Sequence, residues 1–175
     1  MLTEHADIDV STAVEAEGRL IEGLVQFYIY DFSELEPPRS EAFELGADGS
    51  FGPYPYKESY WRDETRVPLI IRRFGRPVGF DLLNAVAHSG LAGDRNMAEF
   101  FVMRKHRRGG VASAAVRTIL SRYTGCWEIA VAERNVGARA FWPRAVESTP
   151  GVRNLTTLRG DGIHWTGPIL RFDVG

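Results

Sequence analysis

The sequence predicts a mixed α/β protein, with an α+β arrangement in which helices flank a central, mostly antiparallel β-sheet. Two observations lead to this fold class. Short apolar stretches with strand-like alternation recur along the chain, and segments of helical periodicity separate them. In the second half a strand, a helix, a strand and a helix follow one another, which requires a crossover and hence one parallel pair. We expect roughly six to seven strands and about four helices.

Length and composition indicate one folded domain over residues 1–175. Of the 175 residues, 44% are hydrophobic and 25% are charged, and the formal net charge is -2, so nucleic-acid binding would require a local basic patch. The single cysteine, Cys126, excludes an intramolecular disulfide and indicates a reducing compartment. The acidic N-terminal stretch does not resemble a signal peptide, and no apolar run approaches the ~20 residues of a membrane span. We therefore expect a cytoplasmic protein that does not enter a membrane.

In the first half, the pattern predicts a strand at Ile8 to Val14 and then an amphipathic helix. Apolar residues at helical spacing define the buried face of this helix: Leu20, Ile21, Leu24, Val25, Phe27, Tyr28 and Phe32. Glu36 to Tyr56 is rich in proline and glycine, which predicts an irregular loop, and loops of this length are often functional. Val67 to Leu83 alternates as two strands around Phe74 and Gly75, which predicts a tight hairpin.

The second half contains the crossover. Its predicted elements are, in order, a strand at Met97 to Met103, a helix at Gly110 to Tyr123, a strand at Cys126 to Glu133, a helix at 136–146, and a hairpin at 155–174 that turns at Asp161 and Gly162. The helix at Gly110 to Tyr123 has only a narrow polar stripe, so we expect it to be largely buried.

A basic turn, RKHRRGG at residues 104–110, leads from a strand into this buried helix. The first backbone N–H groups of a helix have no partner within the helix, so an anion of the phosphate type is stabilised there. Gly109 and Gly110 lack a Cβ atom and allow close approach of a phosphate. Arg107 and Arg108 add positive charge.

Other interpretations of the turn are weaker. A Walker phosphate loop needs Gly-Lys-Ser/Thr, and the dinucleotide fingerprint needs three spaced glycines, and neither pattern is present. A solvated basic turn with a glycine cap is a plain structural alternative. A nucleic-acid patch is disfavoured because no aromatic or further basic residues are interleaved with RKHRR.

Two motifs resemble those of the GNAT-type, acetyl-CoA-dependent N-acetyltransferases. Arg107 to Ala112 fits the pattern Arg/Gln-x-x-Gly-x-Gly/Ala between a strand and a helix, and Asn135, Ala138 and Phe141 fit Asn-x-x-Ala-x-x-aromatic. The order of elements agrees over nearly the whole chain. The combination EFFVMRKHRRGGVA, GCWEIAV, NVGARAFW and GPILRF resembles a subgroup of predicted acetyltransferases without an assigned substrate.

The resemblance implies a binding site for acetyl-CoA. The pyrophosphate would lie on the amides of the turn, and the pantetheine arm would run along the preceding strand, in the gap where that strand splays from its parallel neighbour. The residues implied in coenzyme binding are Phe101, Val102, Met103, Arg107, Arg108, Gly109, Gly110, Val111, Ala112, Ser113, Asn135 and Phe141. A backbone N–H near Phe101 or Val102 would polarise the thioester carbonyl.

The implied reaction is attack of a primary amine, from a small molecule or peptide, on the thioester. The amine must lose a proton first, and Glu99 is the first candidate for the base, with Glu128 second. Strand glutamates also commonly face solvent or form ion pairs. Where many members carry a tyrosine as general acid, this chain has Trp142, whose indole cannot act as an acid at neutral pH. A non-catalytic domain that binds or senses acyl-CoA is therefore the alternative.

The acceptor pocket is expected between the opening helix, the irregular loop and the closing hairpin. Acids and aromatic residues suited to a cationic amine collect in that part of the sequence: Tyr28, Tyr30, Asp31, Glu34, Tyr54, Tyr56 and Trp61. On an amphipathic helix such tyrosines also serve as ordinary packing residues. The four histidines are scattered, so we predict no metal site. A homodimer is common among similar proteins.

Overall fold

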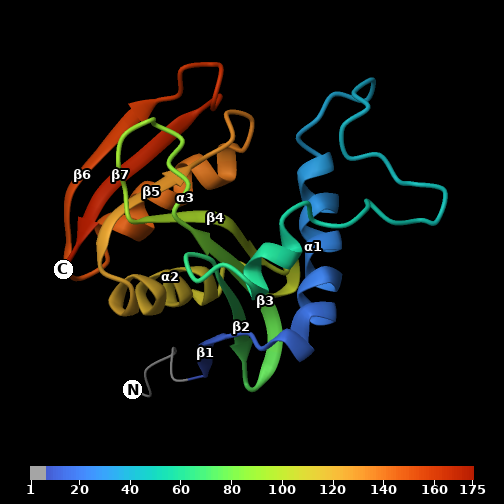
Figure 1. Ribbon diagram of the computed structural model, residues 1–175, viewed down its shortest axis with the longest axis horizontal. Helices are drawn as coiled ribbons and strands as arrows, with labels where there is room; N and C mark the ends of the chain where they lie inside the picture. The colour runs from blue at the N-terminus through green and yellow to red at the C-terminus, as the bar shows by residue number, and fades with distance from the viewer. Residues whose placement is uncertain (1–6) are drawn as a thin grey trace.

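The computed structural model describes residues 7–175 and shows one twisted sheet with helices on both faces (Figure 1). The strands are β1 (Ile8–Thr12), β2 (Val67–Arg73), β3 (Arg76–Asn84), β4 (Arg95–Val102), β5 (Gly125–Ala130), β6 (Val152–Arg159) and β7 (Pro168–Val174). The helices are α1 (Gly18–Ser33), α2 (Val111–Arg122) and α3 (Val136–Glu147), with short 3-10 turns at Glu15–Glu17, Lys57–Trp61 and Arg104–His106. The mixed α/β class predicted from the sequence is confirmed.

The strand order is β1-β2-β3-β4-β5-β7-β6, and β4 with β5 is the parallel pair. These two strands pair only at Arg95 with Trp127 and at Asn96 with Glu128. Beyond Asn96, β4 continues to Val102 without a partner on its β5 side. The predicted splayed pair is present, and it opens a gap in the sheet.

A β-bulge in β4 decides which way its side chains point. Leu82 of β3 pairs with Glu99, whereas Leu83 pairs with Met97, so Ala98 is an extra residue. Met97 therefore packs on the α2 side of the sheet, while Glu99 points to the α1 side. Without the bulge these two side chains would share one face.

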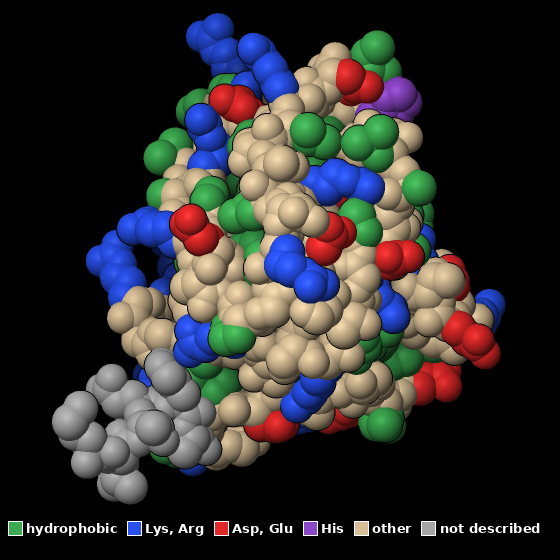
Figure 2. Space-filling view, turned by 90° about the vertical axis from the view of Figure 1, so that its left-hand side faces the viewer, with side chains coloured by type: hydrophobic (Ala, Val, Ile, Leu, Met, Phe, Trp, Pro, Cys, Tyr) green, Lys and Arg blue, Asp and Glu red, His purple; other side chains and the backbone are tan. Residues whose placement is uncertain are grey.

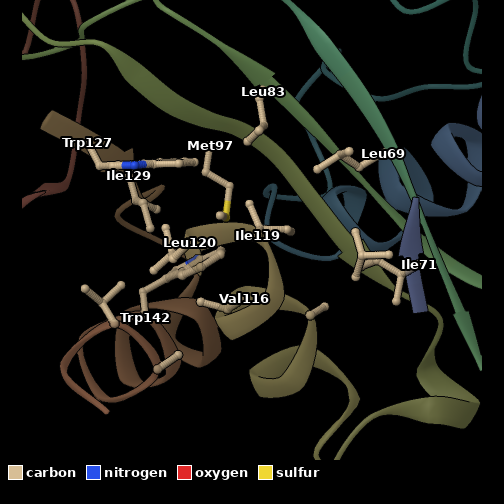
Figure 3. Packing of buried hydrophobic residues seen from close by; sticks show 14 of the residues in the cluster. Leu69, Ile71, Leu83, Met97, Val116, Ile119, Leu120, Trp127, Ile129 and Trp142 are labelled. Carbon is tan, nitrogen blue, oxygen red and sulfur yellow. The ribbon is translucent and has the colours of Figure 1, made fainter. Parts of the chain in front are cut away.

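The core lies in two clusters on opposite faces of the sheet. The larger cluster packs α2 and α3 against the sheet, with side chains such as Ile119, Trp127 and Trp142 closely interdigitated (Figure 3). The smaller one packs Leu24 and Val25 of α1 against the other face. Six of the twelve α2 residues are buried, and only Ser121 and Arg122 at its end are exposed, in agreement with the narrow polar stripe of its sequence.

Residues 34–56 form no helix or strand, as predicted, and swing away from the sheet beyond α1 (Figure 1). The returning end of this loop is fixed to α1 by Gln26. Its Nε2 donates to the Gly52 carbonyl oxygen at 2.9 Å, and its Oε1 accepts from the Phe51 N–H at 2.8 Å. One side chain thus satisfies two backbone groups and positions the residues that follow.

The β2–β3 hairpin turns at Phe74 and Gly75, with φ values of 51° and 73°, as predicted. The closing hairpin differs from the prediction of a tight turn at Asp161 and Gly162, because residues 160–167 form a longer loop between β6 and β7. The Asp161 carboxylate accepts backbone N–H bonds from residues 163 and 164, which curls the chain and delays the start of β7.

Candidate active site

The turn after β4 presents the amino end of α2. Gly110 is the N-cap residue, with a φ of 76°, and no side chain caps the helix. Glycine adopts this left-handed conformation without the steric penalty of a Cβ atom. Arg108 also has a positive φ, 62°, and such strained residues cluster at ligand sites. The first N–H groups of α2 therefore remain available to an anion.

A groove of about 660 Å³ runs past this helix end, with walls from α1, β4, the turn and α3. Most residues implied in coenzyme binding line it: Phe101, Val102, Arg107, Arg108, Gly110, Ala112, Ser113, Asn135 and Phe141. Met103, Gly109 and Val111 do not line the groove, and Val111 is buried in the core. The unpaired end of β4 and the open end of α2 thus line one continuous cavity.

Two basic residues of the turn form ion pairs with acids at the C-terminal end of α1, Asp31 and the cap residue Glu34. Arg104 Nε lies 2.7 Å from Asp31 Oδ1, and its Nη2 lies 2.7 Å from Glu34 Oε2. Arg107 contacts the same Asp31 carboxylate and donates from Nε to the Val102 carbonyl oxygen at 2.7 Å. These contacts tie the end of α1 to the turn. Arg108 forms no ion pair within residues 7–175 and lines the groove.

Glu99 lies between two tyrosine hydroxyls on the α1 side of the sheet. Tyr28 of α1 donates to Glu99 Oε2, and Tyr54 of the loop donates to Oε1 at 3.0 Å. Burial raises the pKa of Glu99 above the ordinary glutamate value, and the two hydrogen bonds offset part of this rise. Such a carboxylate holds a proton more readily than an exposed one, which suits a base that works near neutral pH.

The two tyrosines face different cavities. Tyr28 lines the large groove, whereas Tyr54 lines a neighbouring cavity of about 460 Å³ between α1 and the loop. Burial, followed by the charge of Glu99, raises the pKa of both phenols above the ordinary value, so both are neutral donors. Glu99 itself lines neither cavity, and one tyrosine connects it to each of them.

The other residues expected around an acceptor are divided by the structure. Asp31 and Glu34 line the groove, and Trp61 lines a small pocket beside Tyr54. Tyr30 and Tyr56 are exposed, at 61% and 56%. Residues of the closing hairpin contribute to none of these cavities.

A model of the Acetyltransferase (GNAT) family matches residues 14–146, which include the turn, the groove walls and Glu99. The chain belongs to the GNAT acetyltransferase family. It is therefore an enzyme of the N-acetyltransferase class. By sequence, no curated protein matches this chain.

Solved structures of GNAT proteins share the fold at low sequence identity. An acetyltransferase from Thermus thermophilus superposes with a TM-score of 0.65 and 14% identity, covering 99% of this chain and 100% of its own. A GNAT protein from Staphylococcus aureus gives 0.60 and 9%, covering 96% and 99%. Spermidine N-acetyltransferase from Vibrio cholerae, solved with CoA and spermine, gives 0.54 and 13%, covering 95% and 94%.

Asn135 and Phe141, the second GNAT motif, lie at the start of α3 and within it. The Asn135 Oδ1 atom caps α3 by accepting from the Ala138 N–H at 3.0 Å, which leaves its Nδ2 donors for a ligand. Phe141 stacks on Phe100 of β4 with ring centroids 6.5 Å apart. The motif thus closes the groove opposite the α2 end.

Glu128, the second candidate base, has a different environment. It is fully buried and accepts from the backbone N–H of His88 at 2.9 Å, from Ser89, and from Arg171 Nη1 at 2.8 Å. Burial acts to raise its pKa, but these hydrogen bonds outweigh burial and lower the pKa. Glu128 anchors the loop after β3, and it does not line the groove.

The bonds from Tyr28 and Tyr54 to Glu99 were missed by sequence reasoning, although both tyrosines were grouped near the acceptor. The bonds join residues 71 and 45 positions apart, so no local motif contains them. A partial signal was available, because Tyr28 lies one helical turn after the buried Leu24 and so shares its inward face.

Metal clusters, membrane-spanning helices and basic patches are other features that would bear on function in the described residues. Within residues 7–175, no group of three or more His, Cys, Asp or Glu side chains is arranged to hold a metal ion. In the same residues, the helices are too short or too polar to cross a bilayer. On the face shown in Figure 2, basic side chains are interspersed with acidic and apolar ones.

Proposed function

We propose that this protein transfers the acetyl group of acetyl-CoA to a primary amine of a small molecule or peptide, by direct attack on the thioester. The observation that carries the proposal is the single groove that joins the uncapped end of α2 to the Tyr28 hydroxyl held by Glu99. The helix end in the groove suits an anion, and Tyr28 in its wall connects the groove by a hydrogen bond to Glu99, the candidate base behind it.

The groove fits coenzyme A in its shape and its donors. The amides from Arg108 to Ala112 would hold the pyrophosphate, and the free edge of β4 at Phe101 and Val102 would pair with the pantetheine arm as an added strand would. Met103 follows β4, and its N–H already donates to the Val78 carbonyl oxygen. Asn135 Nδ2 would donate to the same arm from the other side. Acetyl-CoA, when bound, supplies the activated acetyl group.

The chain's own groups would then act on the amine. Glu99 accepts the amine proton, directly or through water, and its burial keeps the proton affinity of the carboxylate above that of an exposed glutamate. A backbone N–H at Phe101 or Val102 donates to the carbonyl oxygen as negative charge develops there. The amine itself would approach through the cavity beside Tyr54, between α1 and the loop.

A thiol-release assay with acetyl-CoA and a panel of amines tests the proposal. The panel contains a polyamine, free amino acids and a peptide with a free N-terminus. We expect release with at least one amine and none with the Gly110→Glu variant. A protein that binds acetyl-CoA tightly by calorimetry and releases no thiol with any amine would contradict it.

A non-catalytic acyl-CoA sensor is the second candidate. It is favoured by one observation, the replacement of the usual tyrosine acid by Trp142, which is only 7% exposed and packs on Phe100 and Phe141 with ring centroids 5.2 and 5.1 Å away. Tight binding without turnover in the same assay would select this alternative.

A further inference from the structure

The GNAT resemblance leaves this chain without a proton donor for the departing thiolate. Trp142 occupies the position of the usual tyrosine, and its ring is locked between Phe100 and Phe141. An indole N–H is a hydrogen-bond donor only. Any replacement must be a neutral acid that reaches the same groove.

Among the tyrosines of residues 7–175, Tyr28 alone lines the groove. It comes from α1, on the opposite side of the groove from α3, and its ring is held edge-on by Phe80 and Phe101 at centroid distances of 5.8 and 6.1 Å. The fixed ring holds the hydroxyl against the Glu99 carboxylate, to which it donates. Tyr28 is therefore linked both to the candidate base and to the cavity.

We propose that Tyr28 donates the proton that the coenzyme A sulfur takes up as it leaves, and that Glu99 returns a proton to Tyr28. This inference rests on the proposed function. It makes Tyr28 and Glu99 one relay, with Tyr28 as the group nearest the sulfur. It also assigns the general acid to the N-terminal helix rather than to α3.

The relay balances without a further reactant. The bond from nitrogen to the acetyl carbon forms, and the bond from that carbon to sulfur breaks. The amine proton goes to Glu99. The Tyr28 hydroxyl, which donates to Glu99 in the resting state, turns to the sulfur and gives up its proton there, and protonated Glu99 then donates the amine proton to the Tyr28 oxygen, so the hydrogen bond between them reverses its direction during the reaction. Both side chains end in their starting states, and one proton has moved from nitrogen to sulfur.

The electrostatics of the pair support this order of transfers. After burial, the largest causes that raise the pKa of Tyr28 are the negative charge of Glu99 and its hydrogen bond. Both causes weaken when Glu99 accepts the amine proton, so Tyr28 becomes a stronger acid at the moment when the thiolate forms. Other titratable and charged groups lie around the pair. Tyr54 donates to Glu99, the charge of Glu99 also acts on Tyr60 and on the buried Asp81, and Arg107 lies over the Phe101 ring.

Paired variants separate proton donation from positioning. Tyr28→Phe and Tyr54→Phe each remove one hydrogen bond to Glu99, but only Tyr28 lines the groove. On the pH plateau, we expect Tyr28→Phe to lower kcat by about 100-fold or more, the usual range for a general acid, with KM for acetyl-CoA unchanged. Tyr54→Phe also touches the site, so we expect a smaller fall in the plateau kcat than in Tyr28→Phe, together with a shift of the pH profile. Tyr123→Phe, at the far end of α2, serves as the remote control.

A rescue experiment then tests the chemistry directly. In the Tyr28→Phe background, Trp142→Tyr restores a phenol at the position usual in the family, and Trp142→Phe is its matched control. We expect thiol release to recover with Trp142→Tyr and not with Trp142→Phe, while thermal melts confirm folding of each variant. Equal losses in Tyr28→Phe and Tyr54→Phe without rescue, or a wild-type rate in Tyr28→Phe, would overturn the relay while leaving the proposed function intact. A wild-type protein that releases no thiol would overturn both.

Discussion

Glu99 on β4 and Glu128 on β5 point to the same side of the sheet, yet their pKa values shift in opposite directions. Glu99 receives two phenolic hydrogen bonds that do not compensate for its burial. Glu128 receives backbone, hydroxyl and guanidinium donors that do. The first carboxylate is adapted to exchange a proton, and the second is adapted to remain charged and hold a loop.

Replacement of Glu99 by glutamine should lower turnover without weakening coenzyme binding. Glutamine keeps the size of the side chain but cannot accept the amine proton, so we expect kcat to fall by about 100-fold or more. Steady-state kinetics and calorimetry with acetyl-CoA measure the two effects. Glu128→Gln is the matched control and should mainly lower the melting temperature. A selective loss of kcat in a folded Glu128→Gln variant would transfer the role of base to Glu128.

The pH dependence of turnover should follow the pKa of Glu99. The reaction needs the ionised carboxylate, so kcat should fall as pH decreases through a pKa that burial has raised above the ordinary glutamate value. Tyr54→Phe removes a hydrogen bond that lowers this pKa, so the acid limb of the kcat profile should move to higher pH. An acid limb that stays in place, or moves to lower pH, would contradict this assignment.

At the scale of elements, the amino end of α2 is the feature on which coenzyme binding depends. Its backbone donors are left open because Gly110 provides the cap without a side chain. The ion pairs from Asp31 to Arg104 and Arg107 hold the preceding turn against α1. The turn is thus positioned before any ligand arrives, which lowers the entropy cost of binding.

A carboxylate at Gly110 should abolish coenzyme binding, because it would lie where the pyrophosphate is proposed to bind. The same position has a φ of 76°, so any side chain there also strains the backbone. Gly110→Gln carries equal strain and size without the charge. Calorimetry should detect weakened binding of acetyl-CoA to Gly110→Gln and no binding to Gly110→Glu. Equal affinities of the two variants would place the anion elsewhere.

The elements were predictable where local patterns decide them. The β2–β3 hairpin, α2 and α3 each follow from periodicity and turn residues within a short window. The loop at 160–167 was not predicted. The Asp161 carboxylate accepts hydrogen bonds from the N–H groups of residues 163 and 164, which in a two-residue turn would be available for pairing between the strands. The bulge at Ala98 and the bonds from Tyr28 and Tyr54 to Glu99 depend on pairing between distant segments, which no single window contains.

At the scale of the whole molecule, the buried Asp81 lowers the stability of the fold at neutral pH. It lies opposite Leu69 and Phe100 in the sheet and is fully buried. Neither carboxylate oxygen makes a well-formed hydrogen bond within the described residues, although the neighbouring Leu82 backbone lowers its pKa in part. Burial raises its pKa well above the ordinary value, so the folded state favours the neutral acid. Between the pKa of Asp81 in the unfolded chain and its higher pKa in the folded protein, only the folded state keeps the proton. The free energy of unfolding therefore decreases as pH rises through this range.

Asp81→Asn should remove this pH-dependent loss. Relative to the variant, the wild type should lose about 1.4 kcal/mol of unfolding free energy per unit of difference between the two pKa values, as pH rises from about 4 toward the folded pKa. Urea denaturation of both proteins across this range measures the difference. Parallel profiles would show that Asp81 titrates normally. The comparison cancels contributions from the other carboxylates, which the two proteins share.

The narrow contact between β4 and β5 has a consequence for how the molecule withstands heat. Within the sheet, two residue pairs join the block formed by β1 to β4 to the block formed by β5 to β7. A ligand bound between β4 and β5 would contact both blocks, and it would therefore stabilise the folded protein where the sheet has the fewest strand-to-strand pairs. The melting temperature should then serve as a gauge of occupancy, which allows compounds to be ranked before any acceptor amine is known.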